Sequence, residues 1–82
     1  MMLNEIQELL QEKISAAEVI VTSDDGRHFE ATIITDAFIN KKTIERQKIV
    51  YGVIGSHITS GSIHALSLKT FTQQEWKDKC DN

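Results

Sequence analysis

An alternating segment followed directly by a helix start most constrains the fold of this chain. From Ile63 to Thr70 the side chains alternate between two faces, and a period of two predicts a β-strand with one buried face. One face carries two leucines together with His64, so we expect this face to meet the core, with His64 at its rim. The two sets are His64, Leu66, Leu68 and Thr70 on one face, and Ile63, Ala65, Ser67 and Lys69 on the other. Thr72 and Glu75 then fit a capping box, which predicts a helix directly after the strand.

The first half of the chain has the pattern of a helix followed by a β-hairpin. Apolar residues recur at three- and four-residue steps over residues 2–15, which predicts an amphipathic helix with glutamates on its other face. Residues 18–22 and 28–35 are rich in β-branched side chains, as strands are. The aspartates and glycine of residues 23–27 predict a tight turn between them.

The middle of the chain is predicted to hold a short helical turn around Phe38 and then a helix from Thr43 to about Ile58. We expect an apolar stripe of this helix, flanked by Val50 and Val53, to face the core, and it consists of Ile44, Tyr51, Ile54 and Ile58. Gly52 and Gly55 weaken such a helix by roughly 1 kcal/mol each relative to alanine. We therefore expect the helix to pack closely on the sheet at these glycines.

The last predicted helix spans residues 73–79 and turns Trp76 inward. The predicted order is α-β-β-α(-α)-β-α, which favours an α+β fold with a three-stranded sheet and helices packed on one side. With 82 residues we expect one domain over residues 1–82, with a frayed tail from about residue 79. No apolar run reaches the ~20 residues of a membrane span, and the single cysteine, Cys80, fits a reducing compartment, so we expect a cytoplasmic protein.

Two blocks of this sequence resemble the BolA-like family. The first is D-A-F-I-N-K-K-T-I-E-R-Q-K-I-V-Y-G, and the second is I-H-A-L-S-L-K-T-F-T-Q-Q-E-W. Gln47, where a histidine is the alternative, makes the chain more similar to the IbaG-type branch of that family. The resemblance covers roughly Glu5 to Trp76 and implies the BolA-like fold, which is similar to a type II KH domain.

The same resemblance implies an adaptor function and a pair of metal ligands. By resemblance, His64 ligates a 2Fe–2S cluster that is shared with a monothiol glutaredoxin, and His28 is an additional ligand. A glutaredoxin cysteine and a glutathione thiolate complete the ligand set. On the residues alone, a histidine satisfied by backbone groups or exposed in a turn is the alternative for each. Cys80 lies in the expected frayed tail near Asp78 and Asp81, whose charges disfavour a thiolate, and we assign it no role.

The basic middle of the chain has two interpretations. Taken with the family resemblance, its helix is the expected contact surface for the glutaredoxin, through Arg46, Gln47, Lys48 and Tyr51. Alternatively the chain is a nucleic-acid-binding regulator that uses Lys41, Lys42, Arg46 and Lys48. The net charge of −3 argues mildly against nucleic acid as the main partner. No catalytic motif is complete, so we expect no enzyme, and we expect the free protein to be a monomer or a weak homodimer.

Overall fold

The computed structural model describes residues 2–61, 63 and 65–81. The chain forms helices and strands in the predicted order. These are α1 (Leu3–Lys13), β1 (Glu18–Thr22), β2 (His28–Ile34), the short 3₁₀ helix η1 (Asp36–Phe38), α2 (Thr43–Thr59), β3 (Ala65–Phe71) and α3 (Gln73–Cys80). The prediction for His64 lies outside the described residues. Within the described part of the chain, no helix is both long and apolar enough to cross a membrane.

The three strands form one sheet in the order β1-β2-β3, with β2 at its centre. β1 and β2 are antiparallel, with Val19 opposite Ile33, as the predicted hairpin requires. β2 and β3 are parallel, with His28 opposite Ala65 and Ile34 opposite Phe71. The side chains on one face of this sheet enter the core, and those on the other face form a surface that α1 and α2 leave uncovered.

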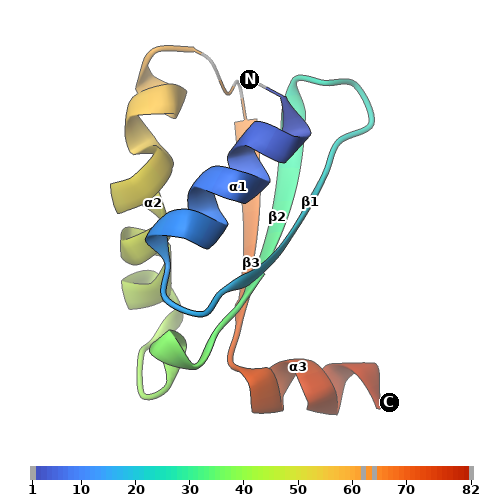
Figure 1. Cartoon of the computed structure of the whole chain (residues 1–82), viewed down its shortest axis with the longest axis vertical. Helices are drawn as coiled ribbons and strands as arrows, with labels where there is room; N and C mark the ends of the chain where they lie inside the picture. The colour runs from blue at the N-terminus through green and yellow to red at the C-terminus, as the bar shows by residue number, and fades with distance from the viewer. Residues whose placement is uncertain (1, 62, 64, 82) are drawn as a thin grey trace.

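The core lies between the sheet and the two long helices (Figure 1). α1 contributes the fully buried Ile6 and Leu10, and α2 contributes the fully buried Val50 and Ile54. Alternation from Phe29 to Ile33 supplies the central part of the sheet's inner face: Phe29, Ala31 and Ile33. The predicted architecture of helices covering one side of a three-stranded sheet is therefore confirmed for α1 and α2.

The predicted inward stripe of α2 is wrong for two of its members. Ile44 is 59% exposed and Tyr51 is 42% exposed, whereas the buried residues of this helix are Arg46, Val50 and Ile54. The helix is thus rotated relative to the expected stripe, so that Arg46 faces inward. Two large apolar side chains are left on the solvent side as a consequence.

Two further expectations about inner and outer faces are wrong. Ile63 was expected on the outer face, but it is fully buried, because the strand begins only at Ala65 and the strand alternation does not extend back to residue 63. Trp76 was expected to face inward, but it is only half-buried on α3, which has no buried residue. This helix lies beyond the end of the sheet (Figure 1), where Trp76 packs edge-on against Phe71 with ring centroids 5.2 Å apart.

The expected close packing at Gly52 and Gly55 is also wrong. A Cβ atom built at either glycine has no other atom within 4 Å, apart from chain neighbours and the backbone of its own helix. Both glycines lie inside α2 without a positive φ. Within this fold, the two glycines therefore weaken the helix without a compensating contact.

Alanine at these two positions should consequently stabilise the protein. Gly52→Ala and Gly55→Ala are each expected to raise the free energy of unfolding by about 0.5–1 kcal/mol, because alanine loses less backbone entropy in a helix. Gly61→Ala is the matched control, since Gly61 also has open space around its Cβ position but has a φ of 85° that alanine adopts only with strain. Urea denaturation measures all three variants, and a destabilising Gly52→Ala would contradict the open packing.

Candidate functional site

The turn between β1 and β2 is closed by hydrogen bonds from its own side chains. The Ser23 Oγ accepts a hydrogen bond from the Gly26 N–H at 2.9 Å and donates one to the His28 carbonyl at 2.7 Å. Asp25 Oδ1 accepts from the N–H groups of Arg27 and His28, each at 2.9 Å. Gly26 supplies the positive φ of 74° that such a turn needs. These bonds fix the backbone on both sides of the first residue of β2.

The imidazole of His28 is held by the same aspartate. Asp25 Oδ2 lies 2.6 Å from His28 Nδ1, while 67% of the histidine side chain is exposed. Hydrogen bonds from the His28 backbone, the His28 ring and the Arg27 backbone hold the pKa of Asp25 well below its usual range. The carboxylate is therefore ionised at neutral pH and only accepts, so that Nδ1 is the donor of this bond. In the neutral ring, Nε2 then carries the lone pair.

This arrangement is the one in which metal-binding histidines are commonly oriented. A ligating imidazole usually donates its second N–H to a carboxylate or carbonyl, which fixes the tautomer and the direction of the lone pair. His28 therefore fits the donor type expected of a metal ligand. Among the described residues, no group of three or more histidine, cysteine or carboxylate side chains is positioned to hold a metal ion.

His28 lies on the face of the sheet opposite to the helices. A shallow hollow of about 210 Å³ adjoins it, and its lining includes Thr22, Glu30 and Ser67 from all three strands. Ala65, which pairs with His28 across the sheet, is the residue that follows His64 in the chain. Cys80 is exposed at the end of α3.

Arg46, which was predicted for both contact surfaces, is used inside the domain. Its Nε donates to the Lys41 carbonyl at 2.8 Å, and its Nη1 and Nη2 donate to the two carboxylate oxygens of Glu75 at 2.6 and 3.2 Å. The guanidinium also stacks over Phe38, 5.7 Å from the ring centre. Only 9% of the residue is exposed. The structure thus assigns Arg46 to a structural role rather than to a contact surface.

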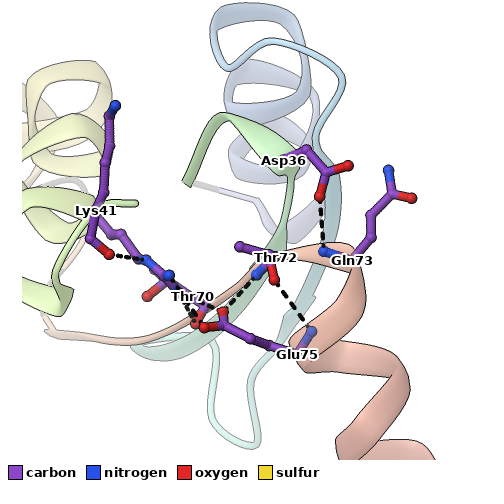
Figure 2. Close-up of polar contacts among 7 residues, drawn as sticks. Asp36, Lys41, Thr70, Thr72, Gln73 and Glu75 are labelled. Carbon is purple, nitrogen blue, oxygen red and sulfur yellow. Dashed lines mark hydrogen bonds and ion pairs between the residues drawn. The ribbon is translucent and has the colours of Figure 1, made fainter. Parts of the chain in front are cut away.

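Glu75 joins this interaction to the predicted capping box. Its carboxylate accepts from the Thr72 N–H at 2.8 Å, and its own N–H donates to Thr72 Oγ1 at 3.2 Å, as Figure 2 shows. Asp36 adds a second anchor by accepting from the Gln73 N–H at 3.2 Å. Hydrogen bonds from Arg46 and then from the Thr72 backbone lower the pKa of Glu75. α3 is therefore attached to the domain largely through polar contacts.

The other predicted contact residues belong to the opposite side of the molecule from His28. Lys42, Lys48 and Tyr51 are exposed, whereas Lys41 and Gln47 are half-buried. The exposed ones lie on or next to the outer side of α2, and His28 is on the helix-free side of the sheet. The structure therefore does not bring the predicted metal ligand and the predicted contact helix together. Sequence reasoning also missed that Asp25 orients the imidazole of His28. The available signal was an aspartate in a turn, three residues before a histidine.

Comparisons with known proteins agree with this fold. Residues 5–75 match the family model described as BolA-like protein. The acid stress protein IbaG of Escherichia coli K12 is 38% identical over 89% of this chain and 86% of its own length. The DNA-binding transcriptional regulator BolA of the same strain is 27% identical over 88% of this chain and 80% of its own length. A solved BolA homologue from Coxiella burnetii superimposes with a TM-score of 0.81 and 36% identity, covering 94% of this chain and 97% of that one.

The contact between Arg46 and Glu75 predicts a pH-dependent contribution to stability. Because the folded-state pKa of Glu75 lies below its unperturbed value of 4.5, the contact stabilises the fold above that pH and is lost as the pH falls through the lowered pKa. Glu75→Gln should therefore lower the free energy of unfolding by about 1 kcal/mol near neutral pH, and the difference should shrink in acid.

Urea titrations followed by the fluorescence of Trp76, the single tryptophan, measure this difference at each pH. Glu8→Gln is the control, since Glu8 is an exposed carboxylate on α1 that forms no ion pair with any described residue. If the difference in free energy of unfolding between the wild type and Glu75→Gln stayed constant from neutral to acidic pH, the role assigned to the ionised Arg46–Glu75 pair would be contradicted.

Proposed function

Because this chain belongs to the BolA-like protein family, we propose that it is a BolA/IbaG-type adaptor that binds a monothiol glutaredoxin and co-ligates a 2Fe–2S cluster. In this proposal the cluster is cargo that is delivered or sensed, and the chain itself is not an enzyme. The family membership alone supports an adaptor or regulator. The finer assignment is supported by the geometry of one side chain.

That side chain is His28, whose ring is oriented before any partner arrives. Asp25 occupies Nδ1, which leaves the lone pair on Nε2 of a side chain that is 67% exposed. A ligand that is already oriented loses little conformational entropy on binding, which favours capture of a metal centre from another protein. The rigid turn and the uncovered face beside it give a second protein access to this nitrogen.

The remaining ligands are proposed to come from His64 and from the partner. As in the family pattern, His64 is the second imidazole, and a glutaredoxin cysteine with a glutathione thiolate completes the set. Exchange of a thiolate for a neutral imidazole lowers the negative charge around iron and raises its reduction potential. Because free imidazole changes its protonation near neutral pH, protons compete with iron for these ligands, which suits transfer of a cluster better than permanent storage.

The position of His28 also changes the proposed contact surface. A partner that presents a cluster to Nε2 would lie over the helix-free face, near the hollow lined by Thr22, Glu30 and Ser67. Gln47, Lys48 and Tyr51 belong to α2, on the helix side of the sheet. We therefore propose that the glutaredoxin contacts the strand face rather than this helix.

Visible absorption and circular dichroism of the cluster test this proposal. On addition of a cluster-loaded monothiol glutaredoxin, the wild-type chain should change both spectra, and His64→Ala and His28→Ala should each remove or alter that change. Asp25→Asn should keep the ligand but lose its orientation, weakening the complex by about tenfold. His57→Gln is the control with the third histidine. Spectra of His28→Ala that match the wild type would remove His28 from the ligand set.

A second candidate function is nucleic-acid binding. It is favoured by the name of the BolA relative, a DNA-binding transcriptional regulator, and by the exposed Lys42 and Lys48. In this alternative the basic end of α2 contacts phosphate groups. Burial of Arg46 leaves fewer cations for that purpose than the sequence suggested.

Salt dependence distinguishes this alternative from the first. If DNA is bound through phosphate contacts, affinity should fall steeply with added salt, and the double variant Lys41→Ala and Lys42→Ala should weaken binding and flatten the salt slope. Lys77→Ala on α3 is the control, with an exposed lysine removed elsewhere. Fluorescence anisotropy of a labelled duplex measures both, and binding that ignores salt would argue against this function.

A further inference from the structure

The two helices that cover the sheet carry opposite charges on their solvent sides. On α1, the exposed Glu5, Glu8 and Glu12 recur at three- and four-residue steps, so they lie along one side of the helix, away from the buried Ile6 and Leu10. α2 lies beside α1 on the same face of the sheet (Figure 1). The solvent side of the layer formed by α1 and α2 therefore combines the glutamates of α1 with the exposed side chains of α2.

The solvent side of α2 is basic and apolar. Lys48 lies one turn after Ile44 and one turn before Tyr51, and all three are exposed along the flank of the helix beside the buried Val50 and Ile54. Lys42 precedes the helix and is also exposed, with Glu45 as the acidic residue beside them. Gly52 and Gly55 lie near the same side of the helix, and the space at their Cβ positions is open.

No ion pair among the described residues compensates these charges. Among the described residues, Arg46 pairs with Glu75, Lys69 pairs with Glu30 and Asp25 contacts the His28 ring. None of these contacts involves the acidic side of α1 or the lysines beside and on α2. Two exposed apolar side chains and two glycines therefore lie beside lysines that form no ion pair with a described residue. The surface has the composition of a contact site for an acidic helix.

We propose that the occupant is a second copy of this chain, in a two-fold dimer in which the helix layers face each other. The proposed two-fold axis lies in the interface, between α1 and α2, and runs along the helices. This axis places α1 of each copy over α2 of the other copy. Both charge-complementary contacts then form at once, as a closed dimer requires. An axis across the helices would instead place acidic α1 over acidic α1.

The direction of the helices specifies which charges meet. α1 and α2 run in roughly opposite directions (Figure 1), so the C-terminal end of α1 lies at the same end of the layer as the start of α2. In the proposed dimer, Glu12 of one copy therefore approaches Lys48 and Lys42 of the other. Ile44 and Tyr51 supply apolar burial, and Gly52 and Gly55 allow the second helix to come close. The helix-free face with His28 stays open in both copies, so the dimer does not depend on the proposed cluster site.

Charge reversal tests this dimer in the full-length protein. Sedimentation equilibrium at low salt should show a concentration-dependent monomer–dimer equilibrium that weakens as salt is added. Lys48→Glu and Glu12→Lys should each weaken dimerisation by about tenfold, because each places like charges opposite each other in both halves of the interface. The double variant, which reverses both partners, should recover the wild-type dissociation constant to within about threefold.

Lys77→Glu is the matched control, since it makes the same charge change on α3, outside the helix layer, and should leave dimerisation unchanged. A protein that stays monomeric at every concentration at low salt would overturn the proposal. So would single reversals without effect, a double variant no better than the single ones, or an equal effect of Lys77→Glu. If the protein stayed monomeric but bound an acidic partner or DNA through Lys48, a molecule other than a second copy would occupy this surface.

Discussion

The central strand β2 is the constraint on which the arrangement of this domain depends. Its alternation sends Phe29, Ala31 and Ile33 into the core, and it places His28 and Glu30 on the helix-free face. β2 is the central strand of the sheet, with a neighbour on each side. The sheet separates the layer of α1 and α2 from an open strand face (Figure 1). Each candidate function belongs to one of these two sides.

Strand alternation and turn chemistry made much of this fold predictable. The hairpin, the existence of the third strand and the capping box of α3 all follow from local patterns. The parallel pairing of β3 with β2 was not predicted, because it joins segments far apart in the sequence. The phase of α2 could not be read in the same way, since Ile44 and Tyr51 are apolar and Arg46 is charged. Arg46 is inside because Glu75, 29 residues later, neutralises it, and a partner so distant in sequence is not visible in a helical pattern.

The candidate site shows the same limit. The sequence predicted His28 as a ligand by resemblance and Asp25 as a turn residue, but it did not connect them. Their contact depends on a turn in which Asp25 bonds two backbone N–H groups with one oxygen and the imidazole with the other. Likewise, open space around Gly52 and Gly55 is a property of what lies near α2, and composition alone suggested the opposite.

The division into two faces bears on the proposed adaptor function. A domain with so small a core has a low free energy of unfolding. The glycines that weaken α2 and the arginine buried in the first half of α2 each lower it further, unless a contact offsets the loss. Arg46 is explained internally, because its contacts hold α3 to the rest of the domain. The glycines and the apolar residues beside Lys48 have no internal explanation in the described structure. A surface that meets another helix accounts for both, and it does so on the side that leaves the oriented imidazole of His28 accessible.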